Sequence, residues 1–221
     1  MIVKVTKGNS KAILYEKQMI SIDISLFTRI ENQLKVLLVK RTEEPFKSCW
    51  SLLGGKVYNN ESCETAVLRE LDEKLALKNI ESFLTGVFSN PVRDPRFRNI
   101  SVSYYGICAS IPKLTINERK LSEIEFFGLD ALPLLAFDHE EILKHSLKIL
   151  REQIYDPRLI KQFVPDIFTL KELQEFFESI FLAKLDKRNF RRKISSLDCL
   201  VKTGEKNEKD TRKKSDYYKL K

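Results

Sequence analysis

A pair of glycines followed by an amphipathic helix constrains the fold of this chain more than any other segment. Val67, Leu71 and Leu75 recur every four positions, which predicts a helix with one apolar stripe. Ser62 is a suitable N-cap for that helix. Residues 54–55 are both glycine, and glycine lets the backbone come close to a ligand or to another element. The segment therefore predicts a glycine turn with a close backbone approach, followed by a helix with one buried face.

A second face of the same helix is polar. It carries Glu70, Glu73 and Lys74, which lie within one turn of each other. Carboxylates one turn apart can hold a hard divalent cation such as Mg²⁺ beside a phosphate. The same spacing also fits an ordinary surface ion pair between Glu70 and Lys74, worth about 0.2–0.5 kcal/mol. The helix face alone leaves both readings open.

The wider spacing resembles the Nudix box, Gly-x5-Glu-x7-Arg-Glu-Leu-x-Glu-Glu-x-Gly-hydrophobic. The matching residues are Gly55, Glu61, Arg69, Glu70, Leu71 and Glu73. Agreement at this many fixed positions is far more specific than a lone glycine motif. The resemblance implies an α+β fold built on a Nudix α/β/α sandwich with a mixed sheet. It also implies a site in which two or three carboxylates hold Mg²⁺ against a pyrophosphate.

Two positions depart from the box. Lys74 replaces the last glutamate of the Glu-Glu pair, which is a metal ligand in the family, and Ala76 replaces a glycine. An ammonium beside Glu70 and Glu73 opposes the binding of a dication. We therefore expect a degenerate, non-catalytic pocket without a cofactor, in which Lys74 stands in for the charge of the metal. The alternative is an active Mg²⁺-dependent pyrophosphatase with Glu70 and Glu73 as its metal ligands.

Apolar runs around the box predict the rest of this first domain. Alternation and apolar content predict strands at residues 20–26, 34–41, 83–88, 100–111 and 125–127, and an edge strand at residues 1–5. A helix is expected from His139 to Gln153, with Asp138 as its N-cap. Residues 156–166 are expected to form a connector or a short helix.

A second, smaller unit is predicted after the connector. Thr169 and Glu172 form a capping box at the start of an apolar-striped helix. Asp186 caps a second helix, which is basic. Two short strands, at residues 200–202 and 217–220, flank a charged loop. Helix, turn, basic helix and wing, in this order and size, predict a winged helix-turn-helix.

The excess of positive over negative charge comes entirely from the last 39 residues, within this second unit. The net charge is +8, and residues 183–221 alone carry 14 basic and 6 acidic side chains. The rest of the chain is therefore neutral, and the asymmetry indicates an end that binds a polyanion. Arginine and asparagine can read guanine and adenine edges in double-stranded DNA. The predicted DNA-binding residues are Lys187, Arg188, Asn189, Arg191, Arg192, Lys193, Arg212, Lys213 and Lys214.

The two units together resemble the Nudix-related transcriptional regulators, in which a Nudix-like sensor domain precedes a winged-helix DNA-binding domain. The segments that carry this resemblance are Lys40–Phe46, Trp50–Gly55, Arg93–Arg96, Ala136–His139, Leu185–Lys193 and Thr203–Glu205. We place the sensor domain at residues 1–155 and the DNA-binding domain at residues 156–221. Leu53 replaces a proline that is common before the two glycines. The resemblance implies a small effector such as ADP-ribose, a related nucleotide, or a sugar or sugar phosphate.

The effector pocket should lie around the box helix and an arginine-rich loop at residues 93–98. A solvated surface loop is an equally good reading of that loop. The candidate effector-binding residues are Arg41, Gly54, Gly55, Glu70, Lys74, Arg93, Arg96 and Arg98. Arginine suits the phosphates of a ligand because its planar guanidinium can donate two parallel hydrogen bonds.

The remaining features set limits on the class of protein. No apolar run reaches membrane-spanning length and no signal-peptide core is present, which predicts a cytoplasmic protein without a membrane partner. The four cysteines are scattered, and the two histidines lack neighbouring metal ligands. Two functions stay open: a DNA-binding regulator, expected to be a repressor, and an active pyrophosphatase with a basic accessory domain. A regulator with one recognition helix per chain should act as a homodimer.

Overall fold

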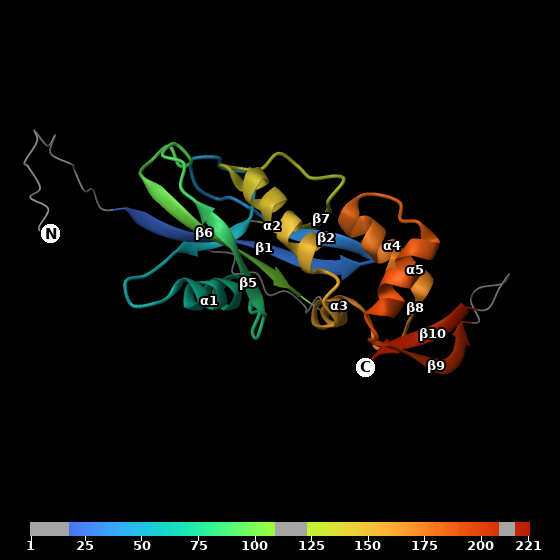
Figure 1. The fold of residues 1–221 in the computed structure, drawn as a ribbon. Helices are drawn as coiled ribbons and strands as arrows, with labels where there is room; N and C mark the ends of the chain where they lie inside the picture. Colours follow the sequence, from blue (N-terminus) through green and yellow to red (C-terminus); the bar gives the residue numbers. More distant parts are fainter. Residues whose placement is uncertain (1–17, 109–122, 208–214) are drawn as a thin grey trace, which may run out of the picture.

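The computed structural model describes residues 18–108, 123–207 and 215–221, and it contains a seven-stranded mixed sheet (Figure 1). The strands are β1 (Met19–Ile30), β2 (Gln33–Lys40), β3 (Trp50–Ser51), β4 (Leu53–Lys56), β5 (Ser82–Phe88), β6 (Asn99–Ile107) and β7 (Glu123–Gly128). Their main order is β3-β2-β1-β6-β5, with β4 also paired to β1 and β7 to β2. β1 and β6 run parallel, and the other pairs are antiparallel.

Two helices cover the opposite faces of this sheet, α1 (Cys63–Leu75) and α2 (His139–Gln153) (Figure 1). Side chains of a strand point alternately to the two faces, and β2 is apolar on both. Leu37 and Val39 pack in the core on the α1 side, and Val36 and Leu38 pack in the core on the α2 side. The predicted α/β/α sandwich with a mixed sheet is confirmed.

The ends of the two helices differ in how well the sequence predicts them. Ser62 caps α1 by accepting a hydrogen bond from the Thr65 amide. At the other end Ala76 takes the left-handed conformation, which explains why the Nudix pattern has glycine there. Asp138 is the N-cap residue of α2, as predicted, but its side chain makes no cap hydrogen bond and instead accepts hydrogen bonds from Arg93.

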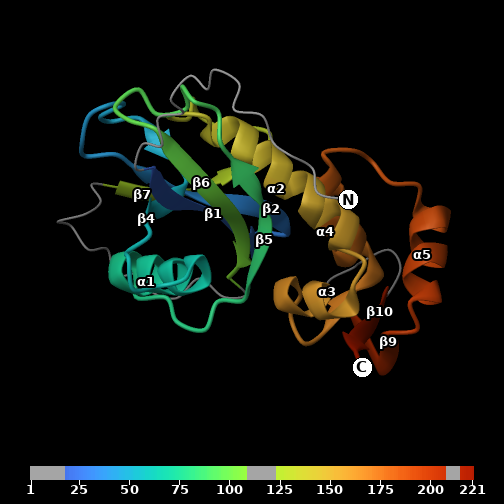
Figure 2. The same ribbon diagram turned by 60° about the vertical axis from the view of Figure 1, so that its left-hand side comes forward.

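The C-terminal unit is a winged helix-turn-helix, as predicted (Figure 2). It consists of α3 (Pro157–Phe163), β8 (Phe168–Thr169), α4 (Leu170–Phe181), α5 (Lys187–Ser196), β9 (Leu200–Asn207) and β10 (Ser215–Leu220). The wing sheet has the order β8-β10-β9. The capping box of Thr169 and Glu172 is present, and Asp186 caps α5 by accepting from the Asn189 amide.

The two units share one hydrophobic core. Phe176 and Phe177 of α4 lie in the same buried cluster as Phe27 of β1 and Leu34 of β2. The Leu34 amide also donates to the Ser179 hydroxyl at 2.8 Å. The winged helix is therefore seated on the end of the β1–β2 hairpin.

Some predicted boundaries shift. β1 continues to Ile30, four residues beyond the predicted end at Leu26, because the chain reverses only at Glu31 and Asn32, both with positive φ. β9 likewise continues through Gly204 to Asn207, although we expected the loop to begin at that glycine. The predicted strand at residues 1–5 and the last residues of the strand at 100–111 lie outside the described residues. Within the described part of the chain, none of the helices has the length and apolar character needed to cross a membrane.

Candidate functional site

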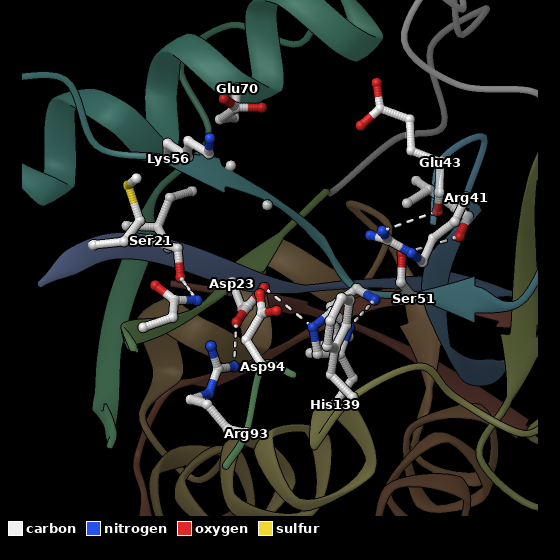
Figure 3. A pocket seen from close by; sticks show the side chains of 18 of the residues that line it. Ser21, Asp23, Arg41, Glu43, Ser51, Lys56, Glu70, Arg93, Asp94 and His139 are labelled. Carbon is white, nitrogen blue, oxygen red and sulfur yellow. Dashed lines mark hydrogen bonds and ion pairs between the residues drawn. The ribbon is translucent and has the colours of Figure 1, made fainter. Parts of the chain in front are cut away.

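A cavity of about 510 Å³ opens between the first strands of the sheet and α1 (Figure 3). It lies over β1 and β4, with the N-terminal end of β6 on one side and the loop after β2 on the other. Of the predicted effector-binding residues, those that line the cavity are Arg41, Gly54, Gly55, Glu70, Lys74, Arg93 and Arg96. Arg98 is not among the lining residues, and its guanidinium donates to the Ser89 and Asn99 carbonyls instead.

The prediction of a turn at the two glycines is wrong, because both lie within strand β4 and pair with β1. The glycines are needed there because α1 and β4 lie very close together. A Cβ atom on Gly55 would come within 2.0 Å of Glu70 Oε1, and one on Gly54 would come within 2.3 Å of the Ile22 carbonyl oxygen. Neither position can hold a side chain without movement of the backbone or of Glu70. The double glycine thus serves to bring the Glu70 carboxylate against the strand.

The Glu70 carboxylate is bound by two cations of its own helix. Its side chain is only 6% exposed, with Oε1 2.6 Å from Arg69 Nη1 and Oε2 2.7 Å from Lys74 Nζ. The Lys74 ammonium also donates to the Gly54 carbonyl oxygen. Lys74 is therefore directed at two oxygen atoms of the kind that a hard divalent cation prefers.

The other two acidic residues of the box are placed differently. Arg69 holds Glu61 through two hydrogen bonds of 2.7 and 2.9 Å, and these lower the pKa of the Glu61 carboxyl. Glu73 lies 3.9 Å from Arg69, and its side chain is 38% exposed. No group of three or more His, Cys, Asp or Glu residues in the described ranges is arranged to hold a metal ion. A divalent metal at the Glu70 carboxylate would have to displace the Lys74 ammonium, which lies 2.7 Å from Glu70 Oε2.

Beneath the cavity lies a buried network that the sequence did not predict (Figure 3). His139 Nδ1 accepts from the Leu52 amide at 3.0 Å, so the ring proton sits on Nε2, 3.4 Å from Asp23. Burial lowers the pKa of His139, which keeps the ring neutral. Arg93 joins the network, donating to Asp138 at 2.7 and 2.8 Å and to Asp23 at 3.2 Å.

This network leaves little of Arg93 for a ligand. Arg93 is only 8% exposed, and its guanidinium is bound by the carboxylates of Asp23 and Asp138. Arg96 is paired as well, with Asp94 at 2.8 and 3.0 Å. Arg41 lies over the Phe137 ring at 4.7 Å and donates to two loop carbonyls. Burial lowers the pKa of Arg41, and the nearby Arg96 lowers it further.

Several lining residues were absent from the predicted site, among them Asp23, Lys56, Asn99, Phe97 and Phe137. Their positions depend on the pairing of β1 with β4 and β6, which local periodicity does not reveal. The only available signal was alternation in β1, where polar Ser21 and Asp23 interrupt an apolar strand.

The predicted DNA-binding residues of α5 fall on different faces of that helix. Phe190 and Ile194 are buried, whereas Arg188, Arg191 and Arg192 are exposed. Arg192 donates to the Asn189 side chain at 3.0 Å. The Lys193 ammonium lies 4.8 Å from the centre of the Tyr155 ring, so it is directed toward the Nudix side. Lys187 is exposed, and residues 212–214 lie outside the described part of the chain.

Two protein families match the chain. The NUDIX domain matches residues 20–147, and the NrtR DNA-binding winged helix domain matches residues 160–220. The domain boundary at residue 156 stays a prediction.

Two relatives are similar in sequence. The ADP-ribose pyrophosphatase of Methanocaldococcus jannaschii is 42% identical over 119 residues, which are 54% of this chain and 69% of the relative. The ADPR responsive transcriptional repressor NtrR of Acinetobacter baylyi is 29% identical over 184 residues, which are 81% of this chain and 73% of the relative.

The likeness to solved structures covers both units. The crystal structure of Shewanella oneidensis NrtR is 31% identical with a TM-score of 0.71, over 91% of this chain and 94% of that chain. The structure of the same protein complexed with a 27mer DNA is 29% identical with a TM-score of 0.70, over 91% of this chain and 93% of that chain. The structure of its NUDIX domain complexed with ADP ribose is 32% identical with a TM-score of 0.56, over 64% of this chain and 94% of that chain. Since the likeness extends over both domains in the same order, this chain belongs to the NrtR family and consists of a Nudix domain followed by an NrtR-type DNA-binding winged helix domain.

Proposed function

We propose that this protein is a transcriptional repressor that binds operator DNA through its winged helix and responds to ADP-ribose bound in its Nudix domain. The observation that carries the proposal is the full-length likeness to Shewanella oneidensis NrtR, whose complexes contain a 27mer DNA and ADP ribose. The Acinetobacter baylyi relative is named an ADPR responsive repressor. The cavity of about 510 Å³ that Glu70 and Lys74 of the box helix line is large enough for a nucleotide sugar.

The DNA-binding part of the proposal rests on charge and shape. The outer side of α5 presents Arg188, Arg191 and Arg192 to solvent, and none of the three has a carboxylate within ion-pair distance among the described residues. An exposed helix with unpaired guanidiniums suits the major groove. Phosphate neutralisation by these residues would supply the salt-dependent share of the affinity.

We further propose that the Nudix domain binds its effector without hydrolysing it. Lys74 occupies the carboxylate that a metal would need, and Arg69 holds Glu61. Without a bound dication the pyrophosphate of the effector lacks the charge neutralisation that metal-dependent hydrolysis requires. The effector can therefore persist as a signal.

A second candidate function is Mg²⁺-dependent hydrolysis of ADP-ribose. It is favoured by one observation, the 42% identity to the Methanocaldococcus jannaschii pyrophosphatase over the Nudix part. Release of AMP from ADP-ribose with Mg²⁺ at about 1 per second or faster would establish this second function and refute the non-catalytic pocket.

Assembly and location follow from DNA binding. One chain offers one recognition helix, and an operator of two half-sites needs two. We therefore propose a homodimer formed mainly through the Nudix domain, and a cytoplasmic protein that meets DNA directly. Light scattering that reports a monomer at micromolar concentration, with and without DNA, would contradict the dimer.

The direct test of the repressor proposal is an electrophoretic mobility shift. A duplex selected by the protein from a randomised library is bound in EDTA, and ADP-ribose is then added. The proposal predicts a shifted complex that ADP-ribose dissolves. A complex that forms and ignores ADP-ribose at millimolar concentration would refute the effector, and the absence of any complex would refute DNA binding.

A further inference from the structure

The cations around the cavity differ in whether they are already paired. Arg69, Lys74, Arg93 and Arg96 each lie within hydrogen-bond distance of at least one carboxylate. Such a cation binds an incoming phosphate only by giving up part of an existing ion pair. Most of the cations around this cavity are therefore already neutralised by carboxylates of the protein.

Lys56 is different. It lines the cavity at the end of β4, is exposed, and has no carboxylate within 4.0 Å among the residues that the structure describes. Its Nζ lies 5.8 Å from the centre of the Phe97 ring. In Figure 3 no dashed line reaches Lys56, whereas Arg41 is tied to its own loop. A lysine in this state can bind an anion without losing another partner.

Asn99 supplies a second, independent observation on the same side of the cavity. The residue is only 7% exposed and lines the cavity, and its Oδ1 atom is buried without a hydrogen-bond partner. Its Nδ2 donates to Ser21 Oγ at 3.0 Å. A buried acceptor without a donor costs about 1–3 kcal/mol, so a small rotation of this side chain that presents Oδ1 to a donor on a ligand is favoured.

The sheet brings these two residues to one place. Ser21 of β1 pairs in register with Lys56 of β4, so their side chains share a face of the sheet. On the other side of β1, Asn99 at the start of β6 reaches the same Ser21 hydroxyl. Lys56 and Asn99 thus flank Ser21 from two neighbouring strands.

We propose that Lys56 and Asn99 form the subsite for a ribosyl phosphate, with Lys56 binding the phosphate and Asn99 Oδ1 accepting a hydrogen bond from a ribose hydroxyl. A phosphate supplies the anion that Lys56 lacks, and a sugar hydroxyl supplies the donor that Asn99 lacks. The subsite deepens the proposed function, because it rests on ADP-ribose as the effector and names the residues that recognise it.

The test is isothermal titration calorimetry of ADP-ribose into full-length protein in EDTA. The variants are Lys56→Gln, Lys56→Arg and Asn99→Leu, with Lys78→Gln as a matched control that removes a lysine whose side chain is 72% exposed and outside the cavity. Loss of a charged hydrogen bond should weaken binding about tenfold to a hundredfold for Lys56→Gln. Loss of a neutral one should weaken it about threefold to tenfold for Asn99→Leu. Lys56→Arg should keep most of the affinity.

The outcomes separate the subsite from the effector. If the unchanged protein does not bind ADP-ribose, the proposed effector is wrong. If it binds, and both Lys56→Gln and Asn99→Leu bind as tightly as Lys78→Gln, the subsite is overturned. Equal losses in Lys56→Gln and Lys56→Arg would also overturn it, because they would show that the lysine acts through shape rather than charge. A thermal melt of each variant without ligand excludes loss of folding as the cause of weaker binding.

Discussion

Replacing Lys74 with glutamate should give the protein a Mg²⁺-dependent stability that the unchanged chain lacks. The substitution removes the ammonium 2.7 Å from Glu70 and places a second carboxylate beside a side chain that is only 6% exposed. Breaking a buried ion pair costs about 3–5 kcal/mol, and we take about 3 kcal/mol here because Lys74 is partly exposed. For a chain of this size that lowers the Tm by about 6–12 °C.

Divalent metal should reverse much of this loss. In the variant, two carboxylates and the Gly54 carbonyl oxygen would face one position, which is a set of oxygen ligands that Mg²⁺ accepts. Binding to the folded state alone stabilises it by about 2.7 kcal/mol when the metal concentration is 100 times Kd. The Tm of the variant should then rise by about 5–11 °C.

The assay is differential scanning fluorimetry of both proteins in EDTA and in Mg²⁺. Lys78→Glu is the matched control, since it makes the same charge change just beyond the same helix, where the side chain is 72% exposed. We expect a Mg²⁺ response only in Lys74→Glu. An equal Mg²⁺ response in the unchanged protein would show that Lys74 does not exclude metal, and a variant as stable as the unchanged protein in EDTA would refute the buried ion pair.

Ala76→Gly should stabilise the protein by about 0.5–1 kcal/mol, because Ala76 has a left-handed backbone (φ 55°) that glycine adopts without strain. A urea titration that shows a lower free energy of unfolding for the variant would contradict this. Replacing Arg191 and Arg192 with alanine should weaken DNA binding. The slope of log affinity against log salt concentration should become shallower by about one unit per lost phosphate contact. Anisotropy titrations with the same affinity and the same slope as the unchanged protein would refute α5 as the DNA-recognition helix. His139 has a pKa below its ordinary value through burial, so the unfolded state binds the proton more readily. The free energy of unfolding should therefore fall as the pH drops below about 6.5, and it should fall less in the His139→Gln variant. Urea titrations that give the same pH dependence of this free energy for both proteins would contradict the prediction.

The local parts of the fold could be predicted because their signals are local. The stripe of Val67, Leu71 and Leu75 predicts α1, and the capping box of Thr169 and Glu172 predicts the start of α4. Such patterns depend on residues within one or two turns, so a single sequence contains them completely. The Nudix box could be identified for the same reason, because its matching residues lie in one continuous segment of the sequence that ends in a single helix.

The site could be predicted only in part because its chemistry depends on long-range pairing. Lys56 and Asn99 meet at Ser21 only because β4 and β6 flank β1 in one particular register. Arg93 stands in an arginine-rich loop that suggested ligand contact, but the fold carries Asp23 and Asp138 to it from 70 and 45 residues away. Charge that looks free in a sequence can thus be neutralised by residues that no local pattern connects to it.

The most direct test of the account is the reciprocity between effector and DNA. The affinity for a fluorescent operator duplex is measured with and without saturating ADP-ribose, and the affinity for ADP-ribose is measured with and without saturating duplex, all in EDTA. Linkage requires the two ratios to be equal, and we expect each to be about 5-fold to 150-fold, with no AMP formed. If the protein binds both ligands but the affinity for ADP-ribose is the same with and without DNA, ADP-ribose in the Nudix domain does not control DNA binding by the winged helix.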